Sequence, residues 1–173
     1  SIPPTPGNSI VKRPNNANLF TLGEVFKQRG YKPLFLYGGY GYFDNMNAFF
    51  SGNGYAVVDR TSINKDAIHG ENIWGVADED LFTMSLEQLD ECYAKQQPFY
   101  AHIMTTSNHR PFTYPSGRID IPTGTGRNGA VKYTDWAIGH FIDEARKKPW
   151  FKDTLFVITA DHGANARGTS EIP

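Results

Sequence analysis

The sequence predicts a layered α/β/α domain with a mostly parallel sheet. Short apolar runs alternate along the chain with amphipathic segments of helical period, the order typical of strands joined by crossover helices. Glycines or polar residues follow directly after three of these runs. In open parallel sheets functional groups gather beyond the carboxyl ends of the strands. These three segments are therefore the predicted location of a functional site.

The chain opens with residues 1–16, which hold four of the eleven prolines and no periodicity. They predict an extended lead-in. A helix is expected over residues 21–29, because Thr21 and Glu24 have the spacing of a capping box and Gly30 suits a helix stop. Its apolar face would consist of Leu22, Val25 and Phe26.

The next stretch contains two short strand candidates. Residues 33–37 form an apolar run that stops at two glycines, which indicates a buried strand and a tight turn. Residues 42–50 predict a short helix, and residues 55–58 predict a second strand. Residues 59–77 are expected to be mostly loop.

Two longer helices are expected in the second half of the chain. The first spans residues 78–95, begins with three acidic residues and repeats apolar side chains at helical spacing. That repeat consists of Phe82, Leu86, Leu89 and Tyr93. The second spans residues 129–147 and ends before Pro149. Its apolar side consists of Ala130, Tyr133, Ala137, Phe141 and Ala145.

Strands are expected before and after that second helix. Residues 98–104 predict a third strand, which a polar loop over about residues 106–128 follows. The apolar run at residues 154–160 predicts the last strand, buried in the sheet.

Length and composition limit the classes of function that the sequence predicts. A length of 173 residues indicates one domain, and a net charge of −1 gives no electrostatic reason to expect nucleic acid as a partner. The chain has no apolar run long enough to span a bilayer, and its first residues do not resemble a signal peptide. Cys92 is the only cysteine, which excludes an internal disulfide, and its place on an amphipathic helix favours a packed thiol.

Asp161 and His162 are the strongest candidates for chemistry. They follow the predicted last strand directly, and a carboxylate with an imidazole can bind one divalent ion. Gly163 permits the turn that two adjacent side chains need in order to converge. The alternative is an aspartate cap beside a partly buried histidine. Two ligands do not close a site, so further ligands are required.

A second candidate follows the strand at residues 98–104. Asn108, His109 and Arg110 come just after it, and histidine and arginine both donate to anionic oxygens. The alternative is a surface loop in which only Pro111 and Phe112 pack.

The third candidate segment follows the glycine pair after the first strand. Asp44 and Asn45 would either cap the short helix or contact a substrate. The segment is not a phosphate-binding P-loop, because it lacks the Gly-Lys-Ser/Thr sequence. Trp74, His69, His102 and His140 are expected to have packing or structural roles, and the acidic residues 78–80 are expected to begin a helix.

Taken in order, these segments resemble the sulfatase-like branch of the alkaline phosphatase superfamily. The resemblance is strongest to the group that contains lipoteichoic acid synthases and phosphoglycerol transferases. The matching segments are residues 21–31, 37–39, 43–46, 74–82, 108–112 and 159–163. In lipoteichoic acid synthases a tryptophan and an arginine that contact the glycerol phosphate lie where Asp44 and Met46 fall here, which fits the Gram-negative-like branch better.

The resemblance implies an alkaline phosphatase-like fold and a transfer of phosphoglycerol from a phospholipid head group to a glycan or polymer acceptor. It also implies a divalent ion, with manganese favoured and zinc, magnesium or calcium as alternatives. Asp161 and His162 match metal ligands, and His109 matches a substrate-contacting histidine. The family's threonine nucleophile and a further acidic ligand would lie upstream of residue 1, so residues 1–173 are expected to form a single partial catalytic domain, truncated at both ends and inactive alone.

Further implications concern location and alternative reactions. The parent protein is expected to be membrane-anchored, with this domain on the periplasmic or extracellular side of the cytoplasmic membrane. Sulfate-ester hydrolysis and phosphoethanolamine transfer are alternatives within the superfamily, although the segment after Cys92 lacks the arginine of a sulfatase maturation site. A non-catalytic domain that binds a glycan or a partner is the remaining alternative.

Overall fold

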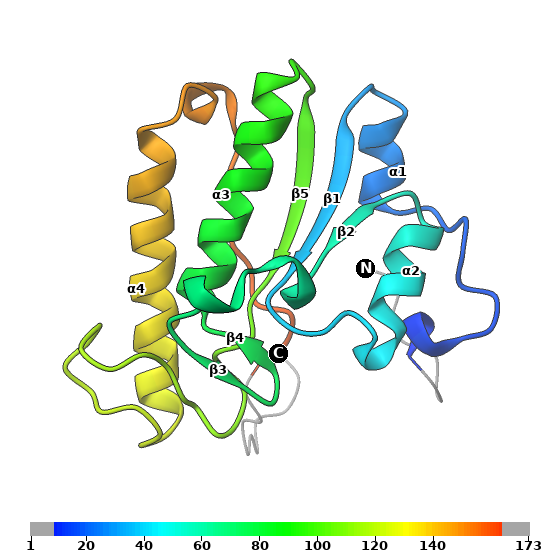
Figure 1. Cartoon of the computed structure of the whole chain (residues 1–173). Coiled ribbons are helices and arrows are strands. Elements are labelled where there is room, and N and C mark those ends of the chain that lie inside the picture. The colour runs from blue at the N-terminus through cyan, green and yellow to red at the C-terminus, as the bar shows by residue number, and fades with distance from the viewer. Residues whose placement is uncertain (1–8, 164–173) are drawn as a thin grey trace, which may run out of the picture.

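The computed structural model describes residues 9–163 and shows a parallel three-stranded sheet with helices on both faces (Figure 1). The strand order is β2 (Ala56–Val58), β1 (Lys32–Tyr37) and β5 (Phe99–Met104). A separate antiparallel hairpin is formed by β3 (Glu71–Asn72) and β4 (Gly75–Val76). The predicted layered α/β/α class with a parallel sheet is confirmed.

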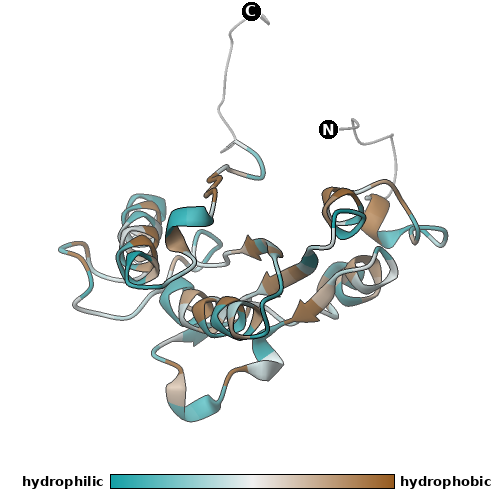
Figure 2. Ribbon diagram, turned by 90° about the horizontal axis from the view of Figure 1, so that it is seen from above, coloured by the Kyte–Doolittle hydropathy of each residue, from teal (hydrophilic) through white to brown (hydrophobic). Residues whose placement is uncertain are grey.

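The central strand β1 explains the layering. Its side chains alternate between two buried faces, as period-two geometry requires. Leu34 and Leu36 belong to one apolar cluster, and Phe35 and Tyr37 belong to another. A strand that is buried on both faces reads as a continuous apolar run, which is the pattern of residues 33–37. Figure 2 shows the apolar strands between the helices.

Two short helices cover the Phe35 face. In α1 (Leu22–Lys27), Phe26 stacks on Tyr100 of β5 with ring centroids 4.7 Å apart. In α2 (Met46–Gly52), Phe50 stacks on Phe35 at 3.6 Å. The capping prediction is confirmed, because Thr21 Oγ1 accepts a hydrogen bond from the Glu24 backbone N–H at 3.2 Å.

The opposite face is covered by α3 (Asp78–Ala94), and α4 (Arg127–Arg146) packs against α3. Leu81, Met84 and Leu89 of α3 share a cluster with Leu34 and Leu36. The predicted apolar side of α4 is confirmed, because all five of its members are buried. Short 3₁₀ turns complete the described secondary structure at Ile10–Lys12, Phe43–Asn45, Arg60–Ser62, Lys65–Ala67 and Phe151–Asp153.

Several local predictions were wrong. Leu22 and Tyr93 were expected on apolar faces but are exposed, because no described element lies over them. The stretch at 59–77 was expected to be mostly loop, and the β3–β4 hairpin within it was not foreseen, because its two-residue strands are too short to show periodicity. The lead-in contains a 3₁₀ turn at Ile10–Lys12, and its first eight residues lie outside the described part of the chain.

The predicted strand at residues 154–160 was also wrong. Within residues 9–163 this segment pairs with no strand, and Leu155, Val157 and Ile158 are 87%, 78% and 67% exposed. Only Phe156 packs, between Phe141 and Phe151. An apolar run becomes a buried strand only when a neighbour satisfies its backbone groups, and none of the described residues does so here. Figure 1 shows the segment running past β5 toward the carboxyl ends of the strands.

The packing of α1 yields a paired prediction for two helical glycines. A Cβ added at Gly23 would lie 2.3 Å from the Tyr55 ring, whereas one at Gly139 on α4 would meet nothing within 4 Å. We expect Gly23→Ala to lower the free energy of unfolding by roughly 1–3 kcal/mol through overpacking. Gly139→Ala should raise it by about 0.5–1 kcal/mol through helix propensity.

Urea denaturation followed by circular dichroism measures both changes. Equal effects of the same sign in the two variants would contradict the assigned packing of α1 on Tyr55.

Candidate functional site at the carboxyl ends of the strands

Asp78, the first residue of α3, holds the loop that follows β5. Its Oδ1 accepts hydrogen bonds from the backbone N–H groups of Thr106 (3.1 Å) and Ser107 (3.0 Å). Its Oδ2 accepts from the Thr134 hydroxyl on α4 at 2.7 Å, and its own N–H donates to Ser107 Oγ. One fully buried carboxyl group therefore joins two helices to the end of a strand.

Asp78 is also electrostatically unusual. Burial raises the pKa of the Asp78 carboxyl above its usual value, while hydrogen bonds from Thr134, Ser107 and Thr106 partly offset that rise. A raised pKa in the folded state means that this group contributes most stability at low pH. That contribution to stability falls as the pH rises from the ordinary pKa of an aspartate, which applies in the unfolded state, through the raised pKa of the folded state. The sequence prediction of a helix-starting residue is correct, although its burial was not foreseen.

The three predicted residues of the loop after β5 differ in their surroundings. Asn108 Nδ2 donates to Thr134 Oγ1 at 3.0 Å, so Asn108 is joined to the Asp78 network. The imidazole of His109 is partly exposed and stacks on the Trp74 indole, with ring centroids 4.2 Å apart and planes at 20°. Arg110 is exposed. Two hydrogen bonds form turns in the backbone of this loop. The His109 N–H donates to Thr106 O, and the Phe112 N–H donates to His109 O.

The end of β2 contributes a buried acid that sequence reasoning missed. Asp59 Oδ2 accepts from the Gly41 N–H at 2.8 Å, and its Oδ1 accepts from the Thr61 N–H at 3.0 Å. Burial alone would raise the pKa of Asp59, but hydrogen bonds from Thr61, Gly41 and Asn47 lower it below its usual value. This residue fixes the turn after β1. A lone acid after a short strand gave no signal in the sequence.

The β3–β4 hairpin is fixed to the same edge by an ion pair. Arg60, which is 6% exposed, donates to both Glu71 carboxylate oxygens at 2.7 Å. The Tyr40 hydroxyl donates to Glu71 at 3.0 Å. Bidentate pairs of this kind restrict geometry as well as adding energy.

Asp44 and Asn45 have left-handed backbone conformations, with φ of +52° and +63°. Neither side chain caps α2. Asp44 instead forms an ion pair with Lys12 at 2.5 Å, and Asn45 Nδ2 donates to Val11 O at 2.8 Å. The neighbouring Phe43 reaches Trp74 edge-on at 5.5 Å, so this segment approaches the His109 loop through Phe43.

Asp161 and His162 lie at the end of the unpaired segment, and both side chains are 72% exposed. Asp161 Oδ2 and His162 Nε2 are 3.5 Å apart. Two ligands of one tetrahedral ion with bonds of about 2.1 Å are separated by roughly 3.4 Å, so this pair fits the donor type and spacing of a divalent ion. Among residues 9–163 no group of three or more His, Cys, Asp or Glu side chains could hold a metal, so these two donors form only part of a ligand set.

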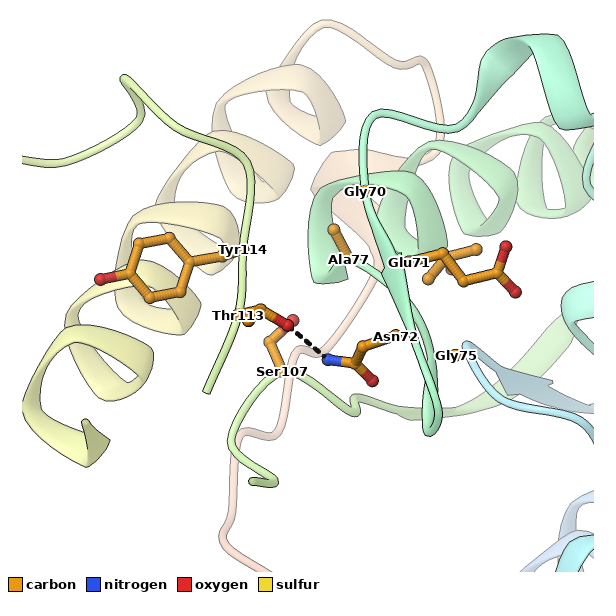
Figure 3. Close-up of a pocket in the computed structure, with 9 residues that line it drawn as sticks. Gly70, Glu71, Asn72, Gly75, Ala77, Ser107, Thr113 and Tyr114 are labelled. Carbon is orange, nitrogen blue, oxygen red and sulfur yellow. Dashed lines mark hydrogen bonds between the residues drawn. The ribbon is translucent and has the colours of Figure 1, made fainter. Parts of the chain in front are cut away.

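A small pocket borders the hairpin and the loop after β5. It has a volume of about 100 Å³ and is lined partly by Asn72, Ser107 and Tyr114 (Figure 3). Asn72 Nδ2 donates across it to Thr113 Oγ1 at 3.0 Å. Ligand pockets commonly measure 300–1,000 Å³, so this space is too small for a phospholipid head group or a sugar.

The remaining candidates have structural surroundings. His69 Nδ1 pairs with the buried Asp80 carboxylate at 2.6 Å, His102 packs edge-on against Phe35 and Phe50, and His140 stacks on Trp136. These contacts agree with the structural roles expected from sequence.

A family profile for sulfatases matches residues 1–171. The chain belongs to the sulfatase family. Curated relatives include phosphoglycerol transferase I of Escherichia coli, 26% identical over 82% of this chain and 20% of that protein. Lipoteichoic acid synthase 1 of Bacillus subtilis is also 26% identical, over 91% of this chain and 27% of that protein. The chain thus spans between a fifth and about a quarter of the length of these relatives.

Two solved structures share the fold of this sulfatase-family chain. A protein of the alkaline phosphatase superfamily from Vibrio parahaemolyticus has a TM-score of 0.80 and 37% identity, covering 87% of this chain and 38% of that one. The lipoteichoic acid synthase LtaP from Listeria monocytogenes has a TM-score of 0.71 and 24% identity, and the match covers 83% of this chain and 37% of that one. The resemblance inferred from the sequence motifs is confirmed.

Cys92 is not an exposed nucleophile. Its side chain is 1% exposed in the α3 core cluster, and burial raises the pKa of its thiol. In the described part of the chain no helix is both long and apolar enough to cross a membrane.

The Asp78 network yields a stability prediction. Asp78→Ala leaves the Thr106 and Ser107 N–H groups without their buried acceptor, so we expect the free energy of unfolding to fall by about 2–4 kcal/mol. Asp78→Asn keeps one acceptor oxygen and should lose about half as much. Urea denaturation at pH 7 measures both, with Asp135→Ala on the exposed side of α4 as the control. A loss in Asp78→Ala no greater than in that control would contradict the anchoring role.

Proposed function

We propose that this chain forms part of the catalytic domain of a metal-dependent phosphoglycerol transferase. The enzyme would move a glycerol phosphate group from a phospholipid to a cell-envelope glycan or polymer. The observation that carries the proposal is the loop of residues 108–110, held at the carboxyl end of β5 in a sulfatase-family chain. Its relatives named phosphoglycerol transferase and lipoteichoic acid synthase support the reaction class.

In this proposal Asp161 and His162 hold a divalent ion, with manganese favoured and zinc, magnesium or calcium as alternatives. Their separation of 3.5 Å supports a shared ion. When bound, such an ion polarises phosphoryl oxygens and lowers the pKa of a nucleophile. We assign the nucleophile to no residue of this chain.

The loop after β5 supplies the substrate contacts. His109 and Arg110 would donate hydrogen bonds to the phosphate oxygens, and Arg110 can do so with two parallel bonds. Asn108 is proposed to contact the substrate together with them. Its Nδ2 donates to Thr134 Oγ1, and Thr134 donates in turn to the Asp78 carboxylate, so this network holds Asn108 beside the two residues. Asp44 and Asn45 are proposed as further contacts, which requires them to release Lys12 and Val11.

We place the domain on the periplasmic or extracellular side of the cytoplasmic membrane, in a membrane-anchored protein. The proposed phospholipid donor lies in a membrane and the proposed cell-envelope acceptor lies outside the cytoplasm, so this location follows from the proposed reaction.

A metal-binding experiment tests the proposal in the complete natural protein that contains these residues. We expect Asp161→Ala and His162→Ala each to weaken manganese binding by about 100-fold or more in isothermal titration calorimetry. Asp135→Ala and His140→Ala on α4 are the matched controls and should bind as the unaltered protein does. Transfer of glycerol phosphate should stop with EDTA and return with manganese. Unchanged affinity in both site variants would overturn the metal assignment.

The 173-residue chain alone is expected to turn over phosphodiesters very slowly. No group of three or more metal donors converges in its described part, and Asp161 and His162 are both exposed, whereas a catalytic site needs at least three protein ligands. Release of product from a phosphodiester, measured with and without manganese, provides the check. Rapid turnover that disappears in Asp161→Ala would show that this chain contains a complete site.

A further inference from the structure

Trp74 lies in the turn between β3 and β4, and its indole covers one face of the His109 imidazole. The ring centroids are 4.2 Å apart and the planes meet at 20°, which is a stacked arrangement. From its sequence context Trp74 was expected to pack rather than to bind a ligand. The ring that it packs against belongs to the proposed substrate-binding residue.

The His109 ring depends on this contact for its orientation. Within residues 9–163 neither ring nitrogen of His109 has a hydrogen-bond partner, and only its backbone takes part in turn bonds. Side chains of this kind commonly rotate unless packing or a hydrogen bond locks them. Stacking restrains the plane of the ring through its face. It therefore leaves both nitrogens, which lie at the edge of the ring, open to a phosphate oxygen.

The indole itself is held on several sides. Its Nε1–H donates to the Arg110 carbonyl oxygen at 2.5 Å, and its backbone N–H donates to Asn72 Oδ1 at 2.8 Å. Phe43 meets it edge-on at 5.5 Å with planes at 83°. With one face on His109 and its N–H bonded to the Arg110 carbonyl oxygen, Trp74 supports the loop.

The hairpin beneath Trp74 is fixed to the sheet. Gly75 has φ of +142°, and an added Cβ there would lie 2.1 Å from the Gly38 carbonyl oxygen. The Val76 N–H donates to that same oxygen at 2.9 Å. Asn72 Nδ2 donates to Thr113 Oγ1, as Figure 3 shows, and Thr113 follows residues 108–110 by three positions. The support is therefore tied both to the end of β1 and to the loop that it orients.

We propose that Trp74 is a positioning residue that fixes the plane of the His109 imidazole, so that its ring nitrogens face the phosphate ester of the substrate. This inference rests on the proposed function, in which His109 contacts that phosphate. Trp74 acts through His109 and makes no contact with the reacting atoms. The three segments that carry Phe43, Trp74 and His109 thus form one aromatic support.

The first test is a nuclear magnetic resonance measurement that needs no activity. An indole stacked on an imidazole moves the ring protons of His109 upfield, and these signals are assigned by their loss in His109→Gln. Trp74→Leu should abolish the upfield shift, and Trp74→Phe should retain part of it. Trp136→Leu removes a second Trp–His stack of the described residues, that of Trp136 on His140 of α4, and should leave the His109 signals unchanged. Unshifted His109 signals in the unaltered protein would overturn the proposal.

The second test is a double-mutant cycle in the complete natural protein, with glycerol phosphate transfer from phosphatidylglycerol vesicles as the readout. Trp74→Leu should lower kcat/KM by about 10- to 100-fold, the effect of a misplaced binding group, and Trp74→Phe should restore most of it. The double variant Trp74→Leu/His109→Gln should be no worse than His109→Gln alone. Losses that add would show that Trp74 acts apart from His109 and would overturn the positioning role.

The two tests together distinguish a failure of this inference from a failure of the proposed function. If His109→Gln leaves transfer unchanged while the ring-current shift is present, the stack exists but the proposed substrate contact fails, and the positioning role fails with it. If His109→Gln abolishes transfer while Trp74→Leu does not reduce it, the proposed function survives and only the positioning role is overturned. Thermal unfolding of each variant identifies any loss caused by misfolding.

Discussion

The buried carboxyl group of Asp78 is the constraint on which the candidate site depends. Placing this group in the interior is unfavourable unless donors surround it, and the chain supplies two backbone N–H groups and one hydroxyl. These donors come from the loop after β5 and from α4, while Asp78 itself begins α3. Satisfying one carboxyl group therefore fixes where the strand ends and where the loop with His109 begins.

Other polar contacts hold the remaining turns at the carboxyl ends of the strands. Asp59 holds the turn after β1, and the Arg60–Glu71 pair holds the hairpin that presents Trp74. Each of these groups is polar and at least partly buried, and each closes a turn whose backbone would otherwise be free. Polar contacts thus hold this edge of the sheet, while the groups proposed to meet the substrate, His109 and Arg110, remain at least partly exposed.

The proposed metal ligands differ from this arrangement. Asp161 and His162 have the donor types and the spacing for a shared ion, but both are exposed at the end of a segment that Phe156 and the hydrogen bonds of Thr154 hold. Their geometry depends on local bonds, such as the His162 N–H to Asp161 Oδ1 at 2.9 Å. Support for His109 comes from long-range contacts, whereas support for the ligand pair is confined to neighbours in sequence.

The sequence by itself determined the parallel α/β/α layering, the cap at Thr21, the buried side of α4 and the motifs of the sulfatase family. These features depend on side-chain period and on residues a few positions apart, which local patterns report directly. Only the tertiary structure decided the burial of Asp78, which binds Thr134 56 positions away, and the stack of Trp74 on His109. It also decided that the apolar run at residues 154–160 is not a strand, because strand formation requires a neighbour. Contacts between distant segments have no period, so no local pattern in the sequence could reveal them.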